Sequence, residues 1–230
     1  MNLVIEAPAA VHLPVVGGGA FPVRRIYCVG RNYAEHAQEM GHTGREPPFF
    51  FMKPADSLVM VADGETGTID YPALTKNLHH EIELVVAIAE GGHDIKAIDA
   101  ASHIWGYAIG LDMTRRDLQN EMKKQGRPWE IGKAFEQSAP IGPLHAKAAT
   151  GELLRGAITL GVNGTLKQKG DLGDLIWSVN ETIEQLSMAW TLQPGDLIFT
   201  GTPAGVGAVA RGDVMDGAIE GLGRLKVAVK

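Results

Sequence analysis

The sequence predicts a β-rich α+β domain, and three observations carry that prediction. Short runs of apolar and β-branched residues recur along the 230 residues, segments with helical periodicity are few, and 29 glycines indicate many tight turns. Hydrophobic residues make up 45% of the chain and charged residues 21%, as in ordinary globular proteins. The length suits one domain with a large core, with residues 1–23 as a short N-terminal segment.

The net charge and the cysteine count argue against several classes of protein. A formal net charge of −6 disfavours a nucleic-acid partner, because affinity for phosphate backbones comes from clustered Lys and Arg. The single Cys28 cannot form a disulfide within the chain and fits a reducing compartment. The amino terminus lacks the pattern of a secretion signal, and no apolar run reaches membrane-spanning length. We therefore expect a cytoplasmic protein that contacts neither nucleic acid nor membrane.

Local patterns place the elements along the chain. Asn163-Gly164 between strand-like segments predicts a type I′ hairpin. Residues 178–190 have the apolar spacing of an amphipathic helix, and residues 94–104 read as a short helix. Alternation in residues 223–230 predicts a half-buried strand.

The stretch from Leu78 to Glu90 places two carboxylates where a buried strand begins. Side chains in a strand alternate, so Glu81 and Glu83 are expected to share one face, and both faces are apolar downstream. Unpaired ionised groups in an interior cost several kcal/mol, so such acids are protonated, paired with cations or bound to a metal. A solvated edge strand, a salt-bridged pair or a chance Glu-x-Glu pattern also explains these residues, and the pattern alone leaves all of these open.

A third carboxylate follows the next strong strand pattern. Residues 105–111 read as a buried strand that ends at Asp112, from where a short side chain can meet the two glutamates. Thr114 and Asp117 resemble a capping box that opens a helix ending near residue 125.

Polar residues near this helix form a second group of candidates. Arg116 and Gln119 are three residues apart, share a helical face and can hold a substrate carboxylate, although a solvated face explains them as well. Lys133 follows Gly132 among apolar neighbours that could desolvate its ammonium group, and a surface lysine is the ordinary alternative. Backbone amides and Thr202 in a late glycine loop could cradle a carboxylate.

A possible proton acceptor precedes all of these residues. Residues 31–41 read as a short helix on which His36 and Glu39 are neighbours. A carboxylate beside an imidazole orients the ring and favours its protonated form, which suits a general base. A solvated surface pair is the plainer explanation. Lys53, after three phenylalanines, points into a pocket or lies over aromatic surface.

Six ordered motifs resemble the fumarylacetoacetate hydrolase family in its compact single-domain form. The resemblance runs from about residue 25 to the C terminus and rests on GRNYAEHAQEMG, FFFMKP, NLHHEIELVVAI, GYAIGLDMTRRDLQ, RPWEIGKAF and PGDLIFTGTPAGVG. It implies a mixed β-sandwich roll with a few short helices that forms a homodimer. Longer members carry an additional N-terminal barrel domain for which we expect no room here.

The resemblance also implies a role for each candidate residue. The ligands of one divalent metal would be Glu81, Glu83 and Asp112. The catalytic residues would be His36, Glu39 and Lys133. The substrate contacts would be Arg31, Lys53, Arg116, Gln119 and Thr202. Oxygen ligands without softer donors select a hard cation, Mg²⁺ or Mn²⁺ with Ca²⁺ as an alternative.

The implied reaction is hydrolysis of a carbon–carbon bond in a 2,4-dioxo acid. Chelation of its 2-oxo acid end would stabilise the departing enolate while His36 activates water, which yields pyruvate and a carboxylic acid. Residues 31–41, which the resemblance implies form a lid helix, and residues 45–56 are similar to fumarylpyruvate hydrolases. This similarity favours fumarylpyruvate, an intermediate of aromatic degradation, as the substrate. Decarboxylation of oxaloacetate and keto–enol isomerisation remain alternatives, because both pass through the same metal-bound enolate. A non-catalytic protein that binds a metal or a 2-oxo acid would keep the three acids without needing a base.

Overall fold

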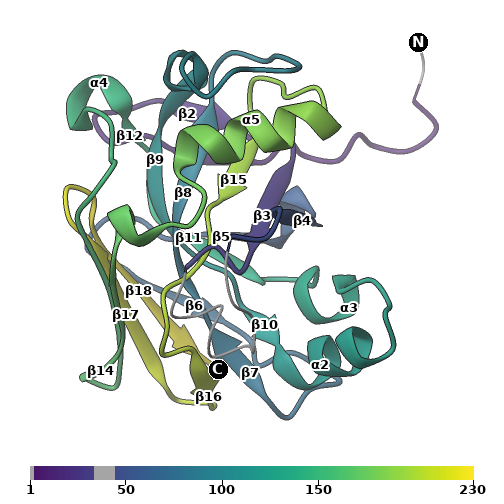
Figure 1. Ribbon diagram of the computed structural model, residues 1–230. Coiled ribbons are helices and arrows are strands. Elements are labelled where there is room, and N and C mark those ends of the chain that lie inside the picture. The colour runs from purple at the N-terminus through teal and green to yellow at the C-terminus, as the bar shows by residue number, and fades with distance from the viewer. Residues whose placement is uncertain (1–2, 34–44) are drawn as a thin grey trace.

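A computed structural model describes residues 3–33 and 45–230, and it confirms the predicted β-rich α+β class (Figure 1). Most strands belong to two sheets, one of eight and one of five strands, that are packed face to face over a common core. Both sheets are mixed, because each contains at least one parallel pair. The architecture matches the expected mixed β-sandwich roll.

The larger sheet has the strand order β4-β3-β15-β8-β9-β11-β5, with β12 paired to β9. Its strands are β3 (Ile26–Gly30), β4 (Phe49–Lys53), β5 (Leu58–Met60), β8 (Ile82–Ile88), β9 (Ile104–Leu111), β11 (Ala139–Ile141), β12 (His145–Ala146) and β15 (Leu197–Phe199). β15 runs parallel to β3 and antiparallel to β8, and β9 runs antiparallel to β8.

The five-stranded sheet has the order β14-β13-β17-β18-β6. Its strands are β6 (Thr66–Ile69), β13 (Ala157–Val162), β14 (Thr165–Asp171), β17 (Val214–Ile219) and β18 (Gly223–Val229). Asn163 and Gly164 join β13 to β14 with φ angles of 51° and 78°, so both central residues are left-handed and the predicted type I′ hairpin is confirmed. β18 confirms the strand predicted at the end of the chain.

Smaller elements complete the fold. The short strands are β1 (His12–Pro14), β2 (Ala20–Pro22), β7 (Leu78–His80), β10 (Thr114–Arg115) and β16 (Gly207–Val209). The helices are α2 (Arg116–Lys124), α3 (Glu130–Lys133), α4 (Lys147–Thr150) and α5 (Val179–Ala189), with 3₁₀ turns η1 (Ala55–Ser57), η2 (Ala100–His103) and η3 (Leu172–Asp174). Within the described ranges, no helix has the length and apolar character needed to cross a bilayer.

Two helix predictions need correction. Residues 94–104 form only the 3₁₀ turn η2, and the residues before it are turns. The helix expected after Asp112 is α2, but Thr114 and Asp117 do not form its capping box. Asp117 instead accepts hydrogen bonds from Thr75 Oγ1 and Lys76 N, because the 75–76 loop lies against the start of α2. The helix predicted at 178–190 is α5, and its capping box uses Ser178 and Glu181.

Strand β8 runs through the centre of the molecule and is buried along its whole length. Ile82, Leu84, Val86 and Ile88 on one face pack into the core shared with the five-stranded sheet and α5. Val85 and Ala87 on the other face pack into a second core that includes residues of β1 and β2. This explains the apolar character of both faces and confirms a strand buried on two sides.

The order and direction of four adjacent strands bring distant residues to one edge of the larger sheet. β3 and β15 run parallel, so the residues that follow them, Arg31 and Gly201, lie at the same edge. β8 runs in the opposite direction, so its first residues, Ile82 and Glu83, lie at this edge. β9 ends at the same edge, and Asp112 follows its last residue. Helices α2 and α3 lie beside this edge (Figure 1). The sheet thus gathers residues that are up to 170 positions apart in the sequence.

Candidate active site

The structure brings Glu81, Glu83 and Asp112 together in the interior. One carboxylate oxygen from each lies within 4.8 Å of the others, and the three residues are 5%, 2% and 1% exposed. They face a cavity of about 340 Å³, part of which is open to solvent. Of the six other predicted site residues that the structure describes, five line the same cavity: Arg31, Arg116, Gln119, Lys133 and Thr202.

Glu81 reaches this position by a break in the strand rather than by strand alternation. The expected strand from residue 78 is two strands, because β7 ends at His80 and pairs in a separate three-stranded sheet. β8 begins at Ile82, and Glu81 lies between them with its carbonyl accepting from Asp112 N at 2.8 Å. This backbone bond fixes two of the three acids relative to each other. The expected single strand is therefore interrupted at Glu81, but the carboxylates of Glu81 and Glu83 lie together as predicted.

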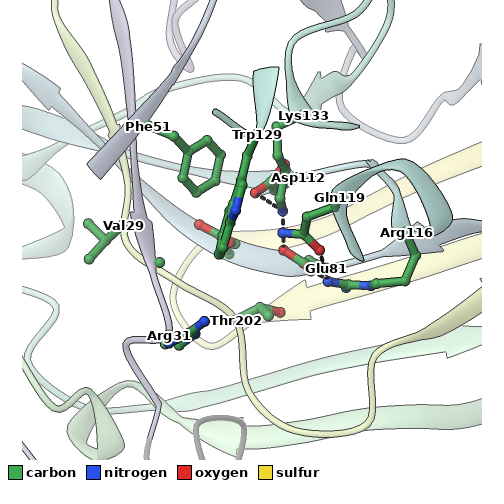
Figure 2. A pocket seen from close by; sticks show the side chains of 12 residues that line it. Val29, Arg31, Phe51, Glu81, Asp112, Arg116, Gln119, Trp129, Lys133 and Thr202 are labelled. Carbon is green, nitrogen blue, oxygen red and sulfur yellow. Dashed lines mark hydrogen bonds and ion pairs between the residues drawn. The ribbon is translucent and has the colours of Figure 1, made fainter. Parts of the chain in front are cut away.

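Three buried cations face the acids. Lys133 Nζ lies 2.7 Å from Glu81 Oε2 and 2.6 Å from Asp112 Oδ2, as Figure 2 shows. Arg116 Nη2 pairs with Glu81 Oε1, and Lys53 Nζ lies 2.9 Å from Asp112 Oδ1. The side chains of all three cations are at most 7% exposed. When all three acids are ionised, as metal ligands are, the charges of the three acids and the three cations cancel.

Lys53 does not occupy the position expected of a substrate contact. It does not line the cavity, and its ammonium group donates to the carbonyls of Met113 and Lys133 behind Asp112. The Phe135 ring lies 5.6 Å from it. Lys53 is thus placed to hold Asp112 and the backbone around it, and its sequence-based role as a substrate contact stays a prediction.

Two carboxylate oxygens in the cluster are incompletely satisfied. Asp112 Oδ1 is buried and, despite its proximity to Lys53, has no hydrogen bond of acceptable geometry within the described residues. Glu83 accepts from Gly201 N at 2.8 Å, and none of the ion pairs above includes it. Burial, followed by the charges of Asp112 and Glu81, raises the pKa of Glu83 well above its usual range. Buried anionic oxygens that converge without enough donors fit a hard divalent cation.

Lys133 remains charged in this environment. Burial lowers the pKa of its ammonium group, but the adjacent charges of Asp112 and Glu81 more than reverse that effect, and the pKa is raised on balance. Lys133 is therefore a fixed positive charge rather than a proton acceptor at neutral pH. Lys133 is the last residue of α3. Its backbone N–H donates to the carbonyl of Trp129, the residue just before this helix, at 3.0 Å.

Arg116 and Gln119 form a unit on α2. Arg116 Nη1 donates to Gln119 Oε1 at 2.5 Å, while its other terminal nitrogen pairs with Glu81. Arg116 Nε lies 3.4 Å from His79 Nδ1, and burial together with this guanidinium lowers the pKa of His79 to about 4. His79 is thus neutral and accepts from Arg116. These bonds use three of the five guanidinium N–H groups and hold the Gln119 oxygen, so the amide NH₂ of Gln119 and the two remaining N–H groups of Arg116 are the donors that the pair can offer to a ligand.

A buried glutamine that the sequence did not reveal holds Thr202. Gln168 Nε2 donates to Thr202 Oγ1 at 2.8 Å, and Gln168 Oε1 accepts from Ile82 N at 3.2 Å and lies 2.8 Å from His80 Nδ1. Since a carbonyl oxygen only accepts, His80 must carry its proton on Nδ1. Thr202 Oγ1 donates to Ile82 O at 2.7 Å, so its proton is already used. In this arrangement the Thr202 hydroxyl proton is used within the protein, and the expected contact of Thr202 with a substrate carboxylate stays a prediction.

Arg31 extends the cavity on the side of β3. Its φ angle of 58° is left-handed, a conformation that costs about 1–2 kcal/mol for a residue with a Cβ atom. Gly30 precedes it because the Phe49 ring covers that position, where an added Cβ would lie 2.0 Å from a ring atom. The Arg31 guanidinium lies over the rings of Phe49 and Trp129, at 5.3 and 5.9 Å from their centroids.

Two predicted site residues lie outside the described part of the chain, and several residues of the cavity were not predicted from the sequence. His36 and Glu39 lie outside the described residues, and only residues 31–33 of their expected helix are described, without helical structure. Four cavity residues were not predicted from the sequence: Val29, Gly30, Phe51 and Trp129. Trp129 lies four positions before Lys133, and that helical spacing is the signal that could have indicated it. Gln168 offers no comparable signal, because it lies in a strand with mostly exposed polar neighbours.

Comparison with known proteins identifies the family of this chain. Residues 25–230 match the family described as "Fumarylacetoacetate (FAA) hydrolase C-terminal". The chain belongs to the fumarylacetoacetate hydrolase family. The resemblance drawn from the six motifs is therefore confirmed.

Relatives within the fumarylacetoacetate hydrolase family include enzymes with different reactions. A crystal structure of fumarylpyruvate hydrolase from Pseudomonas aeruginosa, in complex with Mn²⁺ and pyruvate, is 58% identical, covers 99% of both chains and has a TM-score of 0.98. A fumarylpyruvate hydrolase from Ralstonia sp is 45% identical over 80% of this chain and 93% of its own. A mitochondrial oxaloacetate tautomerase from Rattus norvegicus is 39% identical over 90% of this chain and 92% of its own.

Proposed function

We propose that this protein is a metal-dependent hydrolase that cleaves a carbon–carbon bond in a ketonic substrate. The substrate is a 2,4-dioxo acid, with fumarylpyruvate as the best match, and the products are pyruvate and a carboxylic acid. The similarity to a fumarylpyruvate hydrolase with Mn²⁺ and pyruvate supports this choice. The observation that carries it is the charge balance of the buried cluster.

Glu81, Glu83 and Asp112 would hold one Mg²⁺ or Mn²⁺ ion, with Ca²⁺ as an alternative. Their donor atoms are all hard oxygens, and one oxygen from each acid lies within 4.8 Å of the others beside the cavity. A bound divalent cation supplies a Lewis acid that polarises a ligand carbonyl and stabilises negative charge. The protein's part is to hold the three carboxylates close together in a buried place.

The three acids and three cations cancel, so a divalent cation leaves the site with two positive charges in excess. A 2-oxo acid carries one negative charge on its carboxylate and gains a second when its keto group becomes an enolate. The cluster is thus neutralised by the enolate form of the ligand rather than by the keto form. Selective stabilisation of the charge that develops during reaction is what lowers a barrier. This favours chemistry in which pyruvate leaves as its enolate.

Two described side chains would act directly on the ligand. Lys133 supplies a permanent ammonium group at the carboxylate pair and would neutralise the charge that develops on the keto oxygen. Gln119 would donate its amide NH₂ to the ligand carboxylate, since Arg116 holds its oxygen. Arg116 would orient Glu81 and Gln119.

The proposed base is His36, oriented by Glu39, and this assignment rests on the sequence motif alone. His36 would take a proton from water that attacks the distal carbonyl, after which the bond between carbons 3 and 4 breaks. We expect His36→Ala to lower turnover about 100-fold, a typical contribution of a general base, while metal content is unchanged. Ultraviolet assays and metal analysis of the purified variant measure both quantities. Turnover equal to that of the wild type would exclude His36 as the base.

A panel of three substrates tests the proposed reaction. The chelator-treated protein is supplied with Mn²⁺ or Mg²⁺ and offered fumarylpyruvate, acetylpyruvate and oxaloacetate, while absorbance loss and pyruvate are followed. We expect metal-dependent cleavage of an acylpyruvate, fastest for fumarylpyruvate, and no activity after chelation. Metal-dependent consumption of oxaloacetate alone would replace the proposal with a decarboxylase or tautomerase. Binding of metal and pyruvate without any turnover would indicate a non-catalytic binding protein.

The oxaloacetate alternative has its own support. The relative from Rattus norvegicus is named an oxaloacetate tautomerase, and its reaction needs the same enolate. The metal ligands cannot separate the two reactions, because both place the same charge on the same group. The hydrolase is favoured by the higher identity to fumarylpyruvate hydrolases and by the His36 and Glu39 pair in the sequence.

The wider setting follows from the family and the composition. We propose a single catalytic domain over residues 1–230, a homodimer, a cytoplasmic location and a role in the breakdown of aromatic compounds. Light scattering coupled to size-exclusion chromatography measures the dimer. A monomer at micromolar concentration would remove that part of the proposal.

A further inference from the structure

A second cavity continues outward from the one that contains the acids. It encloses about 890 Å³ including open solvent and lies between β4 and the loop of residues 126–130 that joins α2 to α3. Arg31, Phe51 and Trp129 line both cavities. A ligand held beside the acids therefore has a path along an aromatic wall toward the surface.

Arg31 adds a positive charge at the inner cavity that is not part of the cluster of three acids and three cations. Of the described charged residues that line the inner cavity, the others are the three acids, Arg116 and Lys133, which are paired as set out above. The Arg31 guanidinium lies over two aromatic rings, and its Nε atom is buried without a hydrogen-bond partner among the described residues. Glu46 acts on it electrostatically. A guanidinium that lies over aromatic rings, and whose terminal nitrogens have no hydrogen bond to another described residue, is suited to bind a carboxylate.

Figure 2 shows Arg31 separate from the Lys133, Asp112 and Glu81 cluster, with the ring of Trp129 in the same pocket. The Trp129 ring also contacts Phe49, with centroids 5.0 Å apart and planes 84° apart, and lies 6.1 Å from Phe51. These contacts restrain the tryptophan, so the wall beside Arg31 is rigid and apolar. A flat conjugated chain fits such a wall better than a hydrated polar one.

We propose that Arg31 binds a second carboxylate, at the far end of the acyl chain, and thereby selects acylpyruvates whose acyl group is itself a carboxylic acid. This inference rests on the proposed function and names the residue and substrate class behind its specificity. The charges agree, because such a substrate carries three negative charges as its enolate. The divalent ion leaves two positive charges in the cluster, and Arg31 adds the third.

The charges along the outer cavity indicate where on the acyl chain of the substrate the second carboxylate would be bound. Beyond Arg31 it is lined by Arg127 and Glu130, which are exposed and of opposite sign. Exposed charges are screened by solvent, and Glu130 repels a carboxylate, so neither residue replaces Arg31 as a binding partner. The second carboxylate therefore binds at the boundary between the two cavities. Arg127 offers a matched control, since it is an arginine in the same groove.

The test compares Arg31→Met with Arg127→Met on two acylpyruvates of equal chain length. One is fumarylpyruvate, and the other has a methyl group in place of its terminal carboxylate. Met preserves much of the apolar bulk of the arginine side chain. We expect Arg31→Met to lower kcat/KM for fumarylpyruvate roughly 10- to 100-fold, the worth of a charged hydrogen bond, with less than about threefold change for the methyl analogue. Arg127→Met should change neither by more than about threefold.

The outcomes separate this proposal from the proposed function. Equal losses on both substrates for Arg31→Met would reduce Arg31 to a packing residue and overturn the inference. If the wild type cleaves neither acylpyruvate, the proposed function fails. Calorimetry on the Mn²⁺-loaded protein then decides on Arg31, using a 2-oxo dicarboxylate and the 2-oxo monocarboxylate of the same length. A preference for the dicarboxylate that Arg31→Met removes supports the inference, and the absence of a preference in the wild type overturns it.

Discussion

Replacing Asp112 with Asn is expected to abolish both metal binding and turnover. The variant removes one of three converging carboxylates, and turnover should fall about 1,000-fold or more because a catalytic cation contributes several kcal/mol and 1.4 kcal/mol is tenfold in rate. It also leaves Lys53 and Lys133 facing a neutral amide in the interior, and breaking a buried ion pair costs about 3–5 kcal/mol. Metal content, kcat with added Mn²⁺ and the midpoint of thermal unfolding measure the three effects.

A matched control exists for this substitution. Asp196 is also fully buried, and it pairs with Arg24 at 3.1 Å and accepts from Gln193 N at 2.9 Å, away from the cavity. Asp196→Asn should cost stability but keep metal-dependent turnover, since it changes no residue of the cluster. If Asp112→Asn does not fold, Glu83→Gln is the substitute, because among the described residues no cation is paired with that carboxylate. A variant of either acid that keeps wild-type metal content and turnover would disprove the metal site.

Replacing Lys133 with Met is expected to separate metal binding from chemistry. Without this ammonium group the cluster carries one excess negative charge before the metal binds, so affinity for Mn²⁺ should stay equal or increase. Turnover should nevertheless fall about 100- to 1,000-fold, the loss measured when one preorganised group that stabilises an oxyanion is removed. Calorimetric titration with Mn²⁺ and the absorbance assay give the two quantities on the same sample.

Lys53→Met is the contrasting variant for Lys133→Met. It produces the same charge change beside the same aspartate, but Lys53 lies behind Asp112 and does not line the cavity. We expect it to retain Mn²⁺ binding and more turnover than Lys133→Met, with a loss of stability from its unpaired partners. Equal turnover in the two variants would show that charge, and not contact with the ligand, is what Lys133 contributes.

Much of the fold was predictable because its signals are local. The Asn163-Gly164 turn, helix α5 and the two-sided burial of β8 each follow from neighbouring residues, and the structure has them where expected. The failures came where distant parts of the chain compete with local preference. Asp117 leaves the expected capping box because the loop at Thr75 offers it other donors.

The candidate site likewise combines residues that the sequence indicated with contacts that only the tertiary structure shows. The residue types of the acids, of Lys133 and of Arg116 were visible in the sequence, and the motifs indicated which of them belong together. Their partners were not visible, because the break at Glu81, the position of Lys53 behind Asp112 and the contact of Gln168 with Thr202 all depend on pairing between sheets. A side chain such as Gln168 is polar in any context, and only burial gives it a function.

The sequence by itself determined the chemistry available to this protein: three hard oxygen ligands, a lysine among apolar neighbours and the family to which these motifs belong. Only the tertiary structure decided how the charges balance, because strand order and direction bring the ends of β3, β15 and β9 and the start of β8 to one edge. Coulombic energy depends on distance and burial, and neither is written in the spacing of residues along a chain. For that reason the position of Arg31 over two aromatic rings and the charge balance of the cluster became apparent only in three dimensions.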